Sequence, residues 1–503
     1  MVPNEYEKGQ VSAVTLAALL VDHPFADDEP LLHAPKESMT AGTARAAARA
    51  VATALVAAGV EPGRSVAVQL PNGPGAITAM FGVWLAGAVF VPINVRSPER
   101  ERRRALDATR PAALVTAAGI ESRVGVGDTD PETYDEGVAF VTWTSGTTGA
   151  PKPVLHTHRN YLELLDRVLG PLRGSAGDRE AKRPSPNLVP VSLALNAGIY
   201  NVLFGLRAGA EIVVMDGFDP REFAALVARF AIRSTVLPPA AMAMLSDAPD
   251  VVDLAPLRYV RSITAPLSPL QARRFAEKFD VVVLNGYGQA EIGEVIGWTA
   301  ADAREHPEKL GAVGRPHPGV SIKIGPVEGD DGAGEAGASA IGPLLVRPPT
   351  TAVGIASERL DAEGFIDTGD LARIDEDGFV WIEGRAGDVI NRGGNKVFPE
   401  HVEEVLRLVP SVVDAAVVGS PDDRLGEVPV AYIVTAAPVA DLGAAPVSDL
   451  GAALGADLVA DLEAMCRAHL APYKVPVAFH RVDALPRSEV GKLLRRELAP
   501  PPA

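Results

Sequence analysis

The stretch VAFVTWTSGTTGAPK, residues 138–152, joins an apolar run typical of a buried strand to a loop rich in glycine and hydroxyl side chains. Glycines allow the loop backbone to approach a polyphosphate closely, while hydroxyl and N–H groups donate hydrogen bonds and Lys152 adds a positive charge. The spacing is not that of a Walker A loop, because Lys152 follows Gly149 by three positions and no Ser or Thr comes next. A solvated turn has a similar composition, so this loop alone leaves both interpretations open.

Short apolar runs and stretches with helical spacing alternate over most of the chain. Strands are predicted at residues 65–70, 209–214, 234–237 and 281–284, and a helical stretch precedes each of them. Strands connected by helices favour parallel pairing, because a parallel connection needs a crossover. The predicted fold class is therefore α/β, with a large N-terminal domain of mainly parallel sheets and helical crossovers.

The pattern changes after Arg385 to that of a small α+β domain. Two helices and two strands are expected there, at residues 399–408, 461–469, 415–418 and 430–434. We therefore expect an N-terminal domain over residues 1–386 and a C-terminal domain over residues 387–503. Two segments of biased composition predict a surface insertion at 436–459 and a loop at 328–340.

The composition is that of a large acidic protein. With 503 residues the chain exceeds a single compact core, and its net charge of -17 disfavours nonspecific binding to nucleic acid or anionic membranes. The single cysteine, Cys466, excludes an intramolecular disulfide and a structural zinc site built from cysteines. The polar first residues and the shortness of the apolar runs predict a cytoplasmic protein without a membrane span.

Four further segments accompany the loop at 144–152, in an order and spacing that carry a family resemblance. They are NGYGQAE at 285–291, GFIDTGD at 364–370, GRAGDVI at 384–390 and LPRSEVGKLLR at 485–495. From about residue 40 onward the chain resembles the AMP-forming superfamily of acyl-CoA synthetases, adenylation domains and luciferases. Each residue of these segments could be structural when taken singly: a packed aromatic, a surface carboxylate, a turn residue or a solvated lysine. Five segments in family order are poorly explained by coincidence.

The resemblance implies a binding site for ATP and for a Mg²⁺ ion. Tyr287 would stack on adenine, Asp370 would accept hydrogen bonds from the ribose, and Arg385 would meet ribose or phosphate. Glu291 would hold the metal, a hard cation that prefers carboxylate and phosphate oxygens. The other residues that the resemblance places at ATP are Thr144, Ser145, Gly146, Thr147, Thr148, Gly149, Lys152, Ala265, Gly286, Gly288, Gln289 and Ala290.

The implied chemistry has two steps and three substrates, namely a small-molecule carboxylic acid, ATP and coenzyme A. In the first step the acid attacks the α-phosphorus and expels pyrophosphate, and Lys492 would stabilise the growing negative charge. In the second step the small domain rotates and a thiol attacks the acyl-adenylate, with Gly393 and Gly394 lining the pantetheine path. Gly387 stands where the family pivot is usually Asp or Lys, so we expect easier domain movement.

The acid pocket is expected between Pro190 and Gly198, around Ile263 to Leu267, and next to Tyr287. Its candidate residues are Leu193, Asn196, Ala197, Gly198 and Ile263, with Ala265 nearby. No Asp or Glu occurs between Arg183 and Ala210, which disfavours a free amino acid because its ammonium group would be buried unpaired. A hydrophobic acid, aliphatic, alicyclic or aryl, is favoured, with Asn196 as a single polar contact.

Three functions remain open from the sequence. The favoured one is an acid:CoA ligase, because residues 391–396, NRGGNK, look most like the thiol-accepting loop of such enzymes. The second is a stand-alone adenylating enzyme that loads an acyl or peptidyl carrier protein. The third is a nucleotide-binding protein that has lost catalysis, prompted by Pro153, Ala290 and Gly387, which depart from the family pattern.

Overall fold

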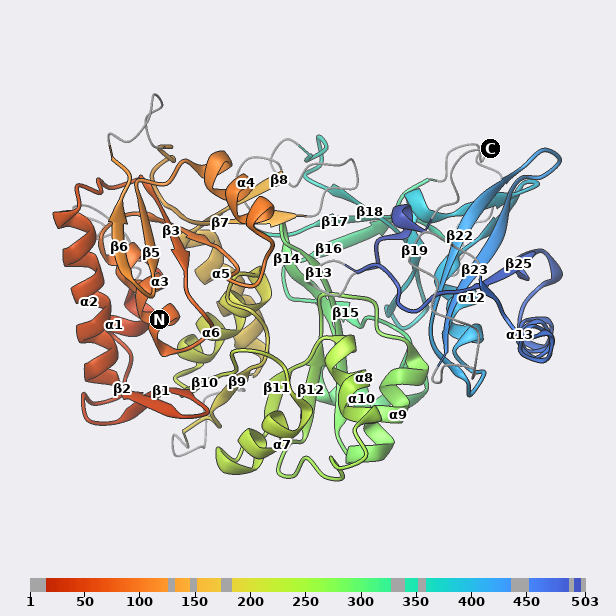
Figure 1. Cartoon of the computed structure of the whole chain (residues 1–503), viewed down its shortest axis with the longest axis horizontal. Coiled ribbons are helices and arrows are strands. Elements are labelled where there is room, and N and C mark those ends of the chain that lie inside the picture. Colours follow the sequence, from red (N-terminus) through yellow and green to blue (C-terminus); the bar gives the residue numbers. More distant parts are fainter. Residues whose placement is uncertain are drawn as a thin grey trace, which may run out of the picture.

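The structure is a computed structural model that describes residues 15–124, 132–144, 152–172, 183–326, 340–351, 359–435, 452–487 and 493–498. Within these residues the strands form four sheets. Figure 1 shows two helix-flanked sheets in the N-terminal two thirds of the chain, while the C-terminal sheet lies at the opposite end of the long axis.

The first sheet has six strands in the order β6-β5-β3-β4-β7-β8. The central pairs β5–β3, β3–β4 and β4–β7 are parallel, and the two edge pairs are antiparallel. The strands are β3 Ser65–Gln69, β4 Val89–Pro92, β5 Ala113–Thr116, β6 Gly119–Ser122, β7 Val138–Thr144 and β8 Lys152–Thr157. The edge helix α4 spans Glu99–Thr109.

Alanine-rich α2 (Ala41–Ala57) packs tightly on α3 (Pro74–Leu85) beside this sheet. The helix begins where the hydroxyl of Thr40 accepts a hydrogen bond from the N–H of Thr43, which satisfies one free donor of the first turn. A Cβ at Gly82 of α3 would lie 2.6 Å from Val51 of α2, so glycine is required for this approach. Together with α1 (Ala18–Val21) these helices bury the largest apolar cluster.

The second sheet has nine strands in the order β15-β14-β13-β12-β11-β9-β10-β1-β2. They are β1 Pro30–Ala34, β2 Glu37–Thr40, β9 Asn187–Val189, β10 Ile212–Val214, β11 Ser234–Val236, β12 Tyr259–Ser262, β13 Val282–Gln289, β14 Gly293–Gly297 and β15 Arg315–Pro316. Its helices are α5 His158–Leu172, α6 Asn196–Ala208, α7 Pro220–Arg229, α8 Pro239–Asp247, α9 Pro269–Phe279 and α10 Ala300–Glu305. The central strands are parallel, and α7, α8 and α9 bury a second apolar cluster with them.

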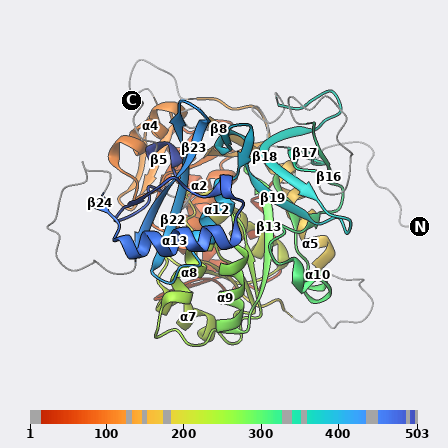
Figure 2. The same cartoon turned by 90° about the vertical axis from the view of Figure 1, so that its right-hand side faces the viewer.

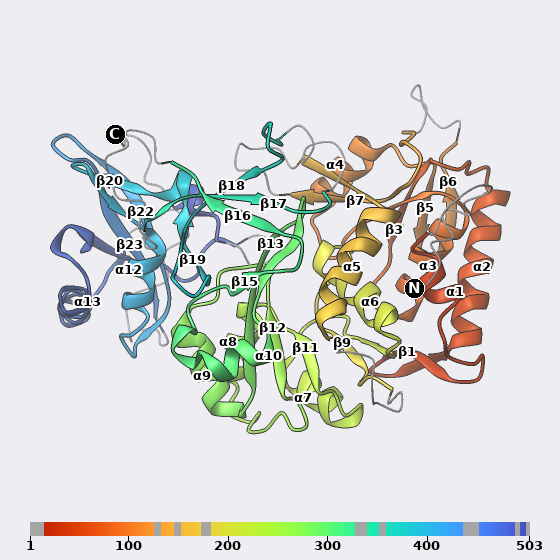
Figure 3. The ribbon, with the colours of Figure 1, turned by 180° about the vertical axis from the view of Figure 1, so that it is seen from behind.

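A third, antiparallel sheet links the two ends of the molecule (Figure 3). Its strands are β16 Ser321–Ile324, β17 Gly342–Arg347, β18 Ile366–Ile374 and β19 Val380–Arg385. The fourth sheet follows a short turn of 3-10 helix, η2 (Ala386–Asp388). It contains β20 Ile390–Arg392, β21 Asn395–Val397, β22 Val412–Asp422, β23 Gly426–Thr435, β24 Ala452–Ala453 and β25 Ala478–Arg481.

Helices α12 (Pro399–Leu406) and α13 (Ala456–His469) pack on the fourth sheet. Leu462 and Cys466 of α13 are fully buried against Ala415 and Ile433 of the long β22–β23 hairpin, and Figure 2 shows α13 crossing this sheet. Cys466 is therefore a packing residue, and burial raises the pKa of its thiol to about 11.

The predicted fold class is confirmed, with a large N-terminal α/β part and a smaller C-terminal sheet. The predicted insertion was partly wrong, because α13 already begins at Ala456 and occupies the last residues of 436–459. Residues 452–453 of that segment form β24, whereas residues 436–451 and most of the predicted loop at 328–340 lie outside the described residues. Across the described part of the chain, every helix is too short or too polar to cross a membrane.

Candidate active site

Four residues predicted to bind ATP converge at the junction of the second and third sheets. Asp370 on β18 is 4% exposed, and its Oδ2 accepts hydrogen bonds from the Tyr287 hydroxyl at 2.5 Å and from Gln289 at 3.2 Å. Its Oδ1 lies 2.7 Å from Nε of Arg385 on the neighbouring strand β19. Tyr287 and Gln289 come from the end of β13, so two sheets build this cluster.

This arrangement gives the Asp370 carboxylate a fixed orientation. A carboxylate has about four lone-pair positions, so three protein donors leave capacity for one hydroxyl more, and displacement of Tyr287 would free another. Burial raises the pKa of Tyr287 well above its ordinary value, and the negative charge of Asp370 adds to the effect. Tyr287 therefore stays a hydrogen-bond donor throughout the neutral range.

A small cavity lies beside this cluster, and residues predicted for three roles line it. Ala290 and Glu291 come from the turn between β13 and β14, Asn196 from the start of α6, and Arg167 from α5. The hydroxyl of Tyr161 donates to Oδ1 of Asn196 at 2.9 Å, which fixes the amide group. The structure thus places the predicted metal residue and one predicted acid residue at the same cavity.

Glu291 is the carboxylate available for a Mg²⁺ ion at this cavity. Its side chain is 12% exposed, and Oε1 lies 3.6 Å from a terminal nitrogen of Arg359, longer than a hydrogen bond. Among the described residues no group of three or more His, Cys, Asp or Glu side chains gathers as for a resident metal. A single carboxylate fits Mg²⁺ that arrives on a nucleotide, since this ion keeps waters and phosphate oxygens as its other ligands.

The predicted acid residues do not all line this cavity. Leu193 lines a second, larger cavity between the first two sheets, together with Met80 and Phe90. Gly198 serves packing, because a Cβ there would lie 2.1 Å from the carbonyl oxygen of Ser192. Ala197 also has a structural contact, accepting a hydrogen bond from the Asn201 amide at 2.7 Å.

The loop after β12 carries two further predicted residues, Ile263 and Ala265, which are half-buried. Thr264 between them has a φ of 83°, a conformation that costs a β-branched residue roughly 1–3 kcal/mol. Ile263 also faces the position where a Cβ on Gly286 would lie, at 3.2 Å. Gly286 therefore leaves space between Ile263 and the cluster around Asp370. Gly288 packs closely against β14, since a Cβ there would be 2.2 Å from the carbonyl oxygen of Gly293.

Two of the predicted catalytic elements fall largely outside the described residues. The backbones of Thr144 and Lys152 pair at the end of the β7–β8 hairpin, whereas Ser145, Gly146, Thr147, Thr148 and Gly149 lie outside them. Lys492 also lies outside, between Arg487 and Leu493, which form an isolated antiparallel bridge. The roles of these residues stay predictions.

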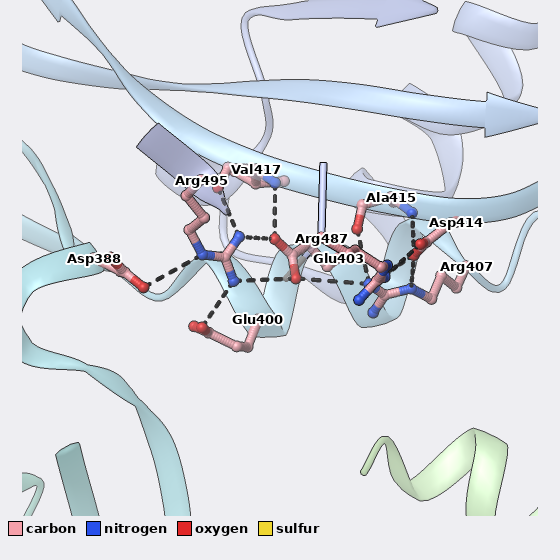
Figure 4. Close-up of polar contacts among 9 residues, drawn as sticks. All are labelled: Asp388, Glu400, Glu403, Arg407, Asp414, Ala415, Val417, Arg487 and Arg495. Carbon is pink, nitrogen blue, oxygen red and sulfur yellow. Dashed lines mark hydrogen bonds and ion pairs between the residues drawn. The ribbon is translucent and has the colours of Figure 1, made fainter. Parts of the chain in front are cut away.

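Arg495, three positions after Lys492, binds a group of carboxylates on the small sheet (Figure 4). Its guanidinium contacts Glu403 of α12 directly, Glu400 at 2.8 Å and Asp388 of η2 at 3.5 Å. It also donates to the carbonyl oxygen of Val417 on β22 at 3.1 Å. This arginine connects the C-terminal segment with helix α12 and with the residue that follows Gly387.

The junction between the two parts contains a second ionic contact. Glu383 of β19 lies 2.9 Å from Nε2 of His401 on α12 and 2.8 Å from Arg373, and its pKa is lowered even though burial alone would raise it. The predicted hinge, Gly387, has free space around it, because a Cβ there would meet no atom within 4 Å. Gly393 and Gly394 form the tight β20–β21 turn with φ values of 56° and 86°.

A buried ionic group near the cluster around Asp370 contains none of the residues predicted from the sequence. Arg261 of β12 contacts Glu294 of β14 directly, and His317 lies 3.2 Å from the same carboxylate oxygen. Glu294 is 7% exposed, and Arg261 holds its pKa below the usual value against the effect of burial. A signal existed in the sequence, since Glu294 is a lone charge between Ile292 and the apolar run Val295–Ile296.

Two family comparisons cover most of the chain. Residues 23–135 and 119–355 match the AMP-binding enzyme family, and residues 401–492 match the AMP-binding enzyme C-terminal domain.

Individual relatives span nearly the full length. A 4-coumarate–CoA ligase-like protein of Oryza sativa is 31% identical, and the match covers 96% of this chain and 92% of that protein. A fatty acid–[acyl-carrier-protein] ligase of Streptomyces coeruleorubidus is 29% identical, with 89% and 88% covered. Among solved structures, an amide bond synthetase of Marinactinospora thermotolerans is similar with a TM-score of 0.77 and 28% identity, covering 96% of this chain and 98% of that one.

Proposed function

The chain belongs to the AMP-binding enzyme family and is an adenylate-forming acid ligase, and we propose that it joins a hydrophobic carboxylic acid to coenzyme A. The main support for nucleotide binding is the cluster of Tyr287, Gln289, Asp370 and Arg385. These residues come from three separate segments, and the other three contact the buried carboxylate of Asp370. Such convergence is what a ribose-binding acceptor requires, because vicinal hydroxyls need an oriented acceptor.

In the first step the acid carboxylate attacks the α-phosphorus of ATP, and the bond to pyrophosphate breaks. Arg385 lies beside Asp370 and can meet the ribose or the phosphate, while Glu291 would hold the Mg²⁺ that screens the repulsion between the two anionic substrates. Lys492 would meet the charge that develops on the transferring group. One such donor contributes about 3–4 kcal/mol, or roughly 100- to 1000-fold in rate.

In the second step the thiol of coenzyme A attacks the acyl carbon, and AMP leaves. The left-handed turn at Gly393 and Gly394 presents backbone without side chains, which suits the close passage of a pantetheine arm. A domain rotation about Gly387 would remove Lys492 from the site. The free space around Gly387 supports this role, because no packed neighbour restrains it.

The test is pyrophosphate and AMP release over a panel of aliphatic, alicyclic and aryl acids, with and without coenzyme A. Wild type is compared with Lys492→Ala and with Lys323→Ala, a half-exposed lysine on β16 that serves as the control. Acid-dependent release that needs Lys492 but not Lys323, with acyl-CoA as product, is the expected result. Equal activity of Lys492→Ala and wild type would contradict the assigned role.

A second candidate acceptor is a phosphopantetheine carrier protein, favoured by the similarity to a carrier-protein ligase. Pyrophosphate release without acyl-CoA, but with acylation of a carrier protein, would replace coenzyme A by that acceptor. A nucleotide-binding protein without catalysis would bind ATP in a calorimeter and release no pyrophosphate with any acid.

A further inference from the structure

The first turn of helix α12 lies against strand β19, so the two parts of the chain on either side of Gly387 are in direct contact. A Cβ on Gly384 of β19 would lie 2.9 Å from Oε2 of Glu400 and 3.4 Å from the ring of Phe398. The two elements therefore approach each other closely. This contact joins residues that lie on opposite sides of the predicted hinge.

An ionic hydrogen bond crosses the same contact. Nε2 of His401 lies 2.9 Å from one oxygen of the Glu383 carboxylate, and Arg373 holds the other oxygen at 2.8 Å. Burial alone would raise the pKa of Glu383, but the hydrogen bond and charge of His401, together with Arg373, lower it. The ring of Phe398 packs on His401 with centroids 5.3 Å apart. The carboxylate is thus ionised and fixed by its own sheet, and the imidazole reaches it from the other part.

The bond between Glu383 and His401 spans the predicted hinge. The segment that connects β19 with α12 contains Gly387, and a Cβ on Gly387 would meet no atom within 4 Å. A rotation about Gly387 that moves α12 away from β19 must break the bond, because Arg373 holds Glu383 and Phe398 packs on His401. The hinge itself offers little resistance, so the contacts of α12 with β19 determine how strongly this orientation is favoured.

The orientation that this bond holds does not suit thiol transfer. The predicted pantetheine residues, Gly393 and Gly394, form the turn between β20 and β21. The N–H of Gly393 donates to the carbonyl oxygen of Leu425 at 2.7 Å, at the tip of the β22–β23 hairpin. Figure 1 and Figure 3 show this end of the fourth sheet pointing away from β18, the strand that carries Asp370. A rotation is therefore needed before these glycines can approach the cluster around Asp370.

We propose that Glu383 and His401 are positioning residues, whose bond holds the C-terminal part in the orientation for adenylate formation and opens before thiol transfer. This inference rests on the proposed function and assigns residues to the change between its two steps. Each step uses one orientation, so its rate is proportional to the population of that orientation. Loss of the bond shifts the ratio of the two populations toward the rotated orientation.

Single-turnover measurements of the two steps test the assignment. Adenylate formation is followed by pyrophosphate release without coenzyme A, and thiol transfer by acyl-CoA formation from the purified acyl-adenylate. In His401→Ala the rate of thiol transfer divided by that of adenylate formation should rise about 3- to 10-fold, the range for a partly exposed ionic hydrogen bond. The quotient follows the ratio of populations, so it changes by this factor whichever orientation predominates. An unchanged or lower quotient would overturn the inference, including the case in which both steps slow equally.

The variants Glu383→Leu and Glu383→Leu/His401→Ala locate the effect in the pair. Both should show the quotient of His401→Ala within about twofold, because the bond can be lost only once. A double variant whose effect equals the product of the two single effects would place the cause outside the pair. His469→Ala changes an exposed histidine at the end of α13 and should keep the wild-type quotient.

The orientation can also be measured without turnover. Cys466 is the only cysteine of the chain and is fully buried, so it does not compete for a spin label. Labels on Arg159→Cys of α5 and on Asp423→Cys at the tip of the β22–β23 hairpin, both exposed positions, report the distance between the two parts. In His401→Ala the population at a second distance, relative to the main one, should rise about 3- to 10-fold. Identical distance distributions with and without His401→Ala would contradict the assignment.

The outcomes separate this inference from the proposed function. Pyrophosphate release with an unchanged quotient and unchanged distances leaves the ligase in place and rejects the pair as positioning residues. A shift in the distances without pyrophosphate release from any acid keeps the role of the pair and rejects the ligase. No change in the distances and no pyrophosphate release would overturn both.

Discussion

Asp370 shows how one buried carboxylate can organise the side chains of a proposed nucleotide site. It is buried at the seam of two sheets, and its oxygens are held by Tyr287, Gln289 and Arg385. A buried anion is stable only when it is paired and hydrogen-bonded, and these three donors supply that. The same contacts set the direction in which the remaining lone pairs can accept a ligand.

We predict that Asp370→Asn raises the KM for ATP by about 10- to 100-fold, because the amide presents one acceptor and no charge to the ribose. Asp367→Asn is a matched control on the same strand, since Asp367 is exposed and its Oδ1, retained in Asn, accepts from the Gly369 N–H at 2.8 Å. Initial rates over a range of ATP concentrations measure the effect. An unchanged KM for ATP in Asp370→Asn would show that Asp370 does not hold the nucleotide.

Residues of the site that lie in the family motifs could be predicted from the sequence. Residues outside the motifs could not. Asp370, Tyr287 and Arg385 stand in recognisable segments, and their proximity followed from the resemblance. Arg261 and Arg167 stand in no motif, and only the pairing of strands and the packing of α5 bring them to Glu294. Contacts between distant segments of this kind depend on tertiary structure and have no local pattern.

Helix α12 acts as the support of the C-terminal segment. Glu400 and Glu403 lie one turn apart on helix α12, and the Arg495 guanidinium contacts both carboxylates. Burial raises the pKa of Glu400 even beside this arginine, so the arrangement depends on a fixed cation. A second arginine, Arg487, contacts Asp414 of β22 on the other side of the predicted catalytic lysine in the sequence (Figure 4).

Arg495→Met is expected to destabilise the C-terminal part by about 3–5 kcal/mol, because the buried Glu403 then keeps only the more distant Arg407, at 3.7 Å, as a cation. Arg496→Met, a change at the neighbouring exposed residue, should stay within about 0.5 kcal/mol of wild type. Calorimetric unfolding of each variant makes the comparison. The double variant Arg495→Met/Glu403→Gln should recover part of the loss, and failure to recover any would place the cost elsewhere than in the unpaired carboxylate.

The sequence predicted which helices and strands occur in the C-terminal part better than it predicted the residues at which they begin and end. The helix expected at 399–408 ends at Leu406, and the strand expected at 415–418 extends over Val412–Asp422. The extension arises from pairing with β23 along its whole length, which the local apolar pattern does not encode. The predicted helix at 461–469 starts earlier, at Ala456, and Leu462 and Cys466 lie on its buried side.

On the scale of the whole molecule, the predicted site lies where large and small parts meet. Asp370 and Arg385 belong to the sheet that continues through η2 into the C-terminal part, and Glu383 on β19 already contacts His401 of α12. A rotation about Gly387 would exchange such contacts for others while the nucleotide cluster on β13 and β18 stays intact. Under the proposed function, this position would allow both steps to use one bound adenylate.

Three histidines of the N-terminal part make its stability depend on pH. Burial lowers the pKa of His156 to about 3, and the pKa values of His23 and His158 to about 4. In the unfolded chain all three titrate near 6.5. Between these limits the unfolded chain binds protons that the folded protein does not, so the full stability is present above pH 6.5 and is lost as the pH falls.

We predict that the free energy of unfolding of the N-terminal part decreases below pH 6.5 by about 1.4 kcal/mol per pH unit for each buried histidine. His156 stacks on Phe140 at 4.4 Å and hydrogen-bonds Thr142, so His156→Gln costs stability at neutral pH but removes one titrating group. Only the interval between pH 6.5 and 5.5 contributes, so the difference in unfolding free energy between pH 7.5 and 5.5, measured with urea, should be smaller by about 1.4 kcal/mol in His156→Gln. His469→Gln changes an exposed histidine at the end of α13 and should keep the wild-type difference. Equal differences in wild type and His156→Gln would mean that His156 accepts its proton inside the folded protein, which its contacts in the core of the first sheet oppose.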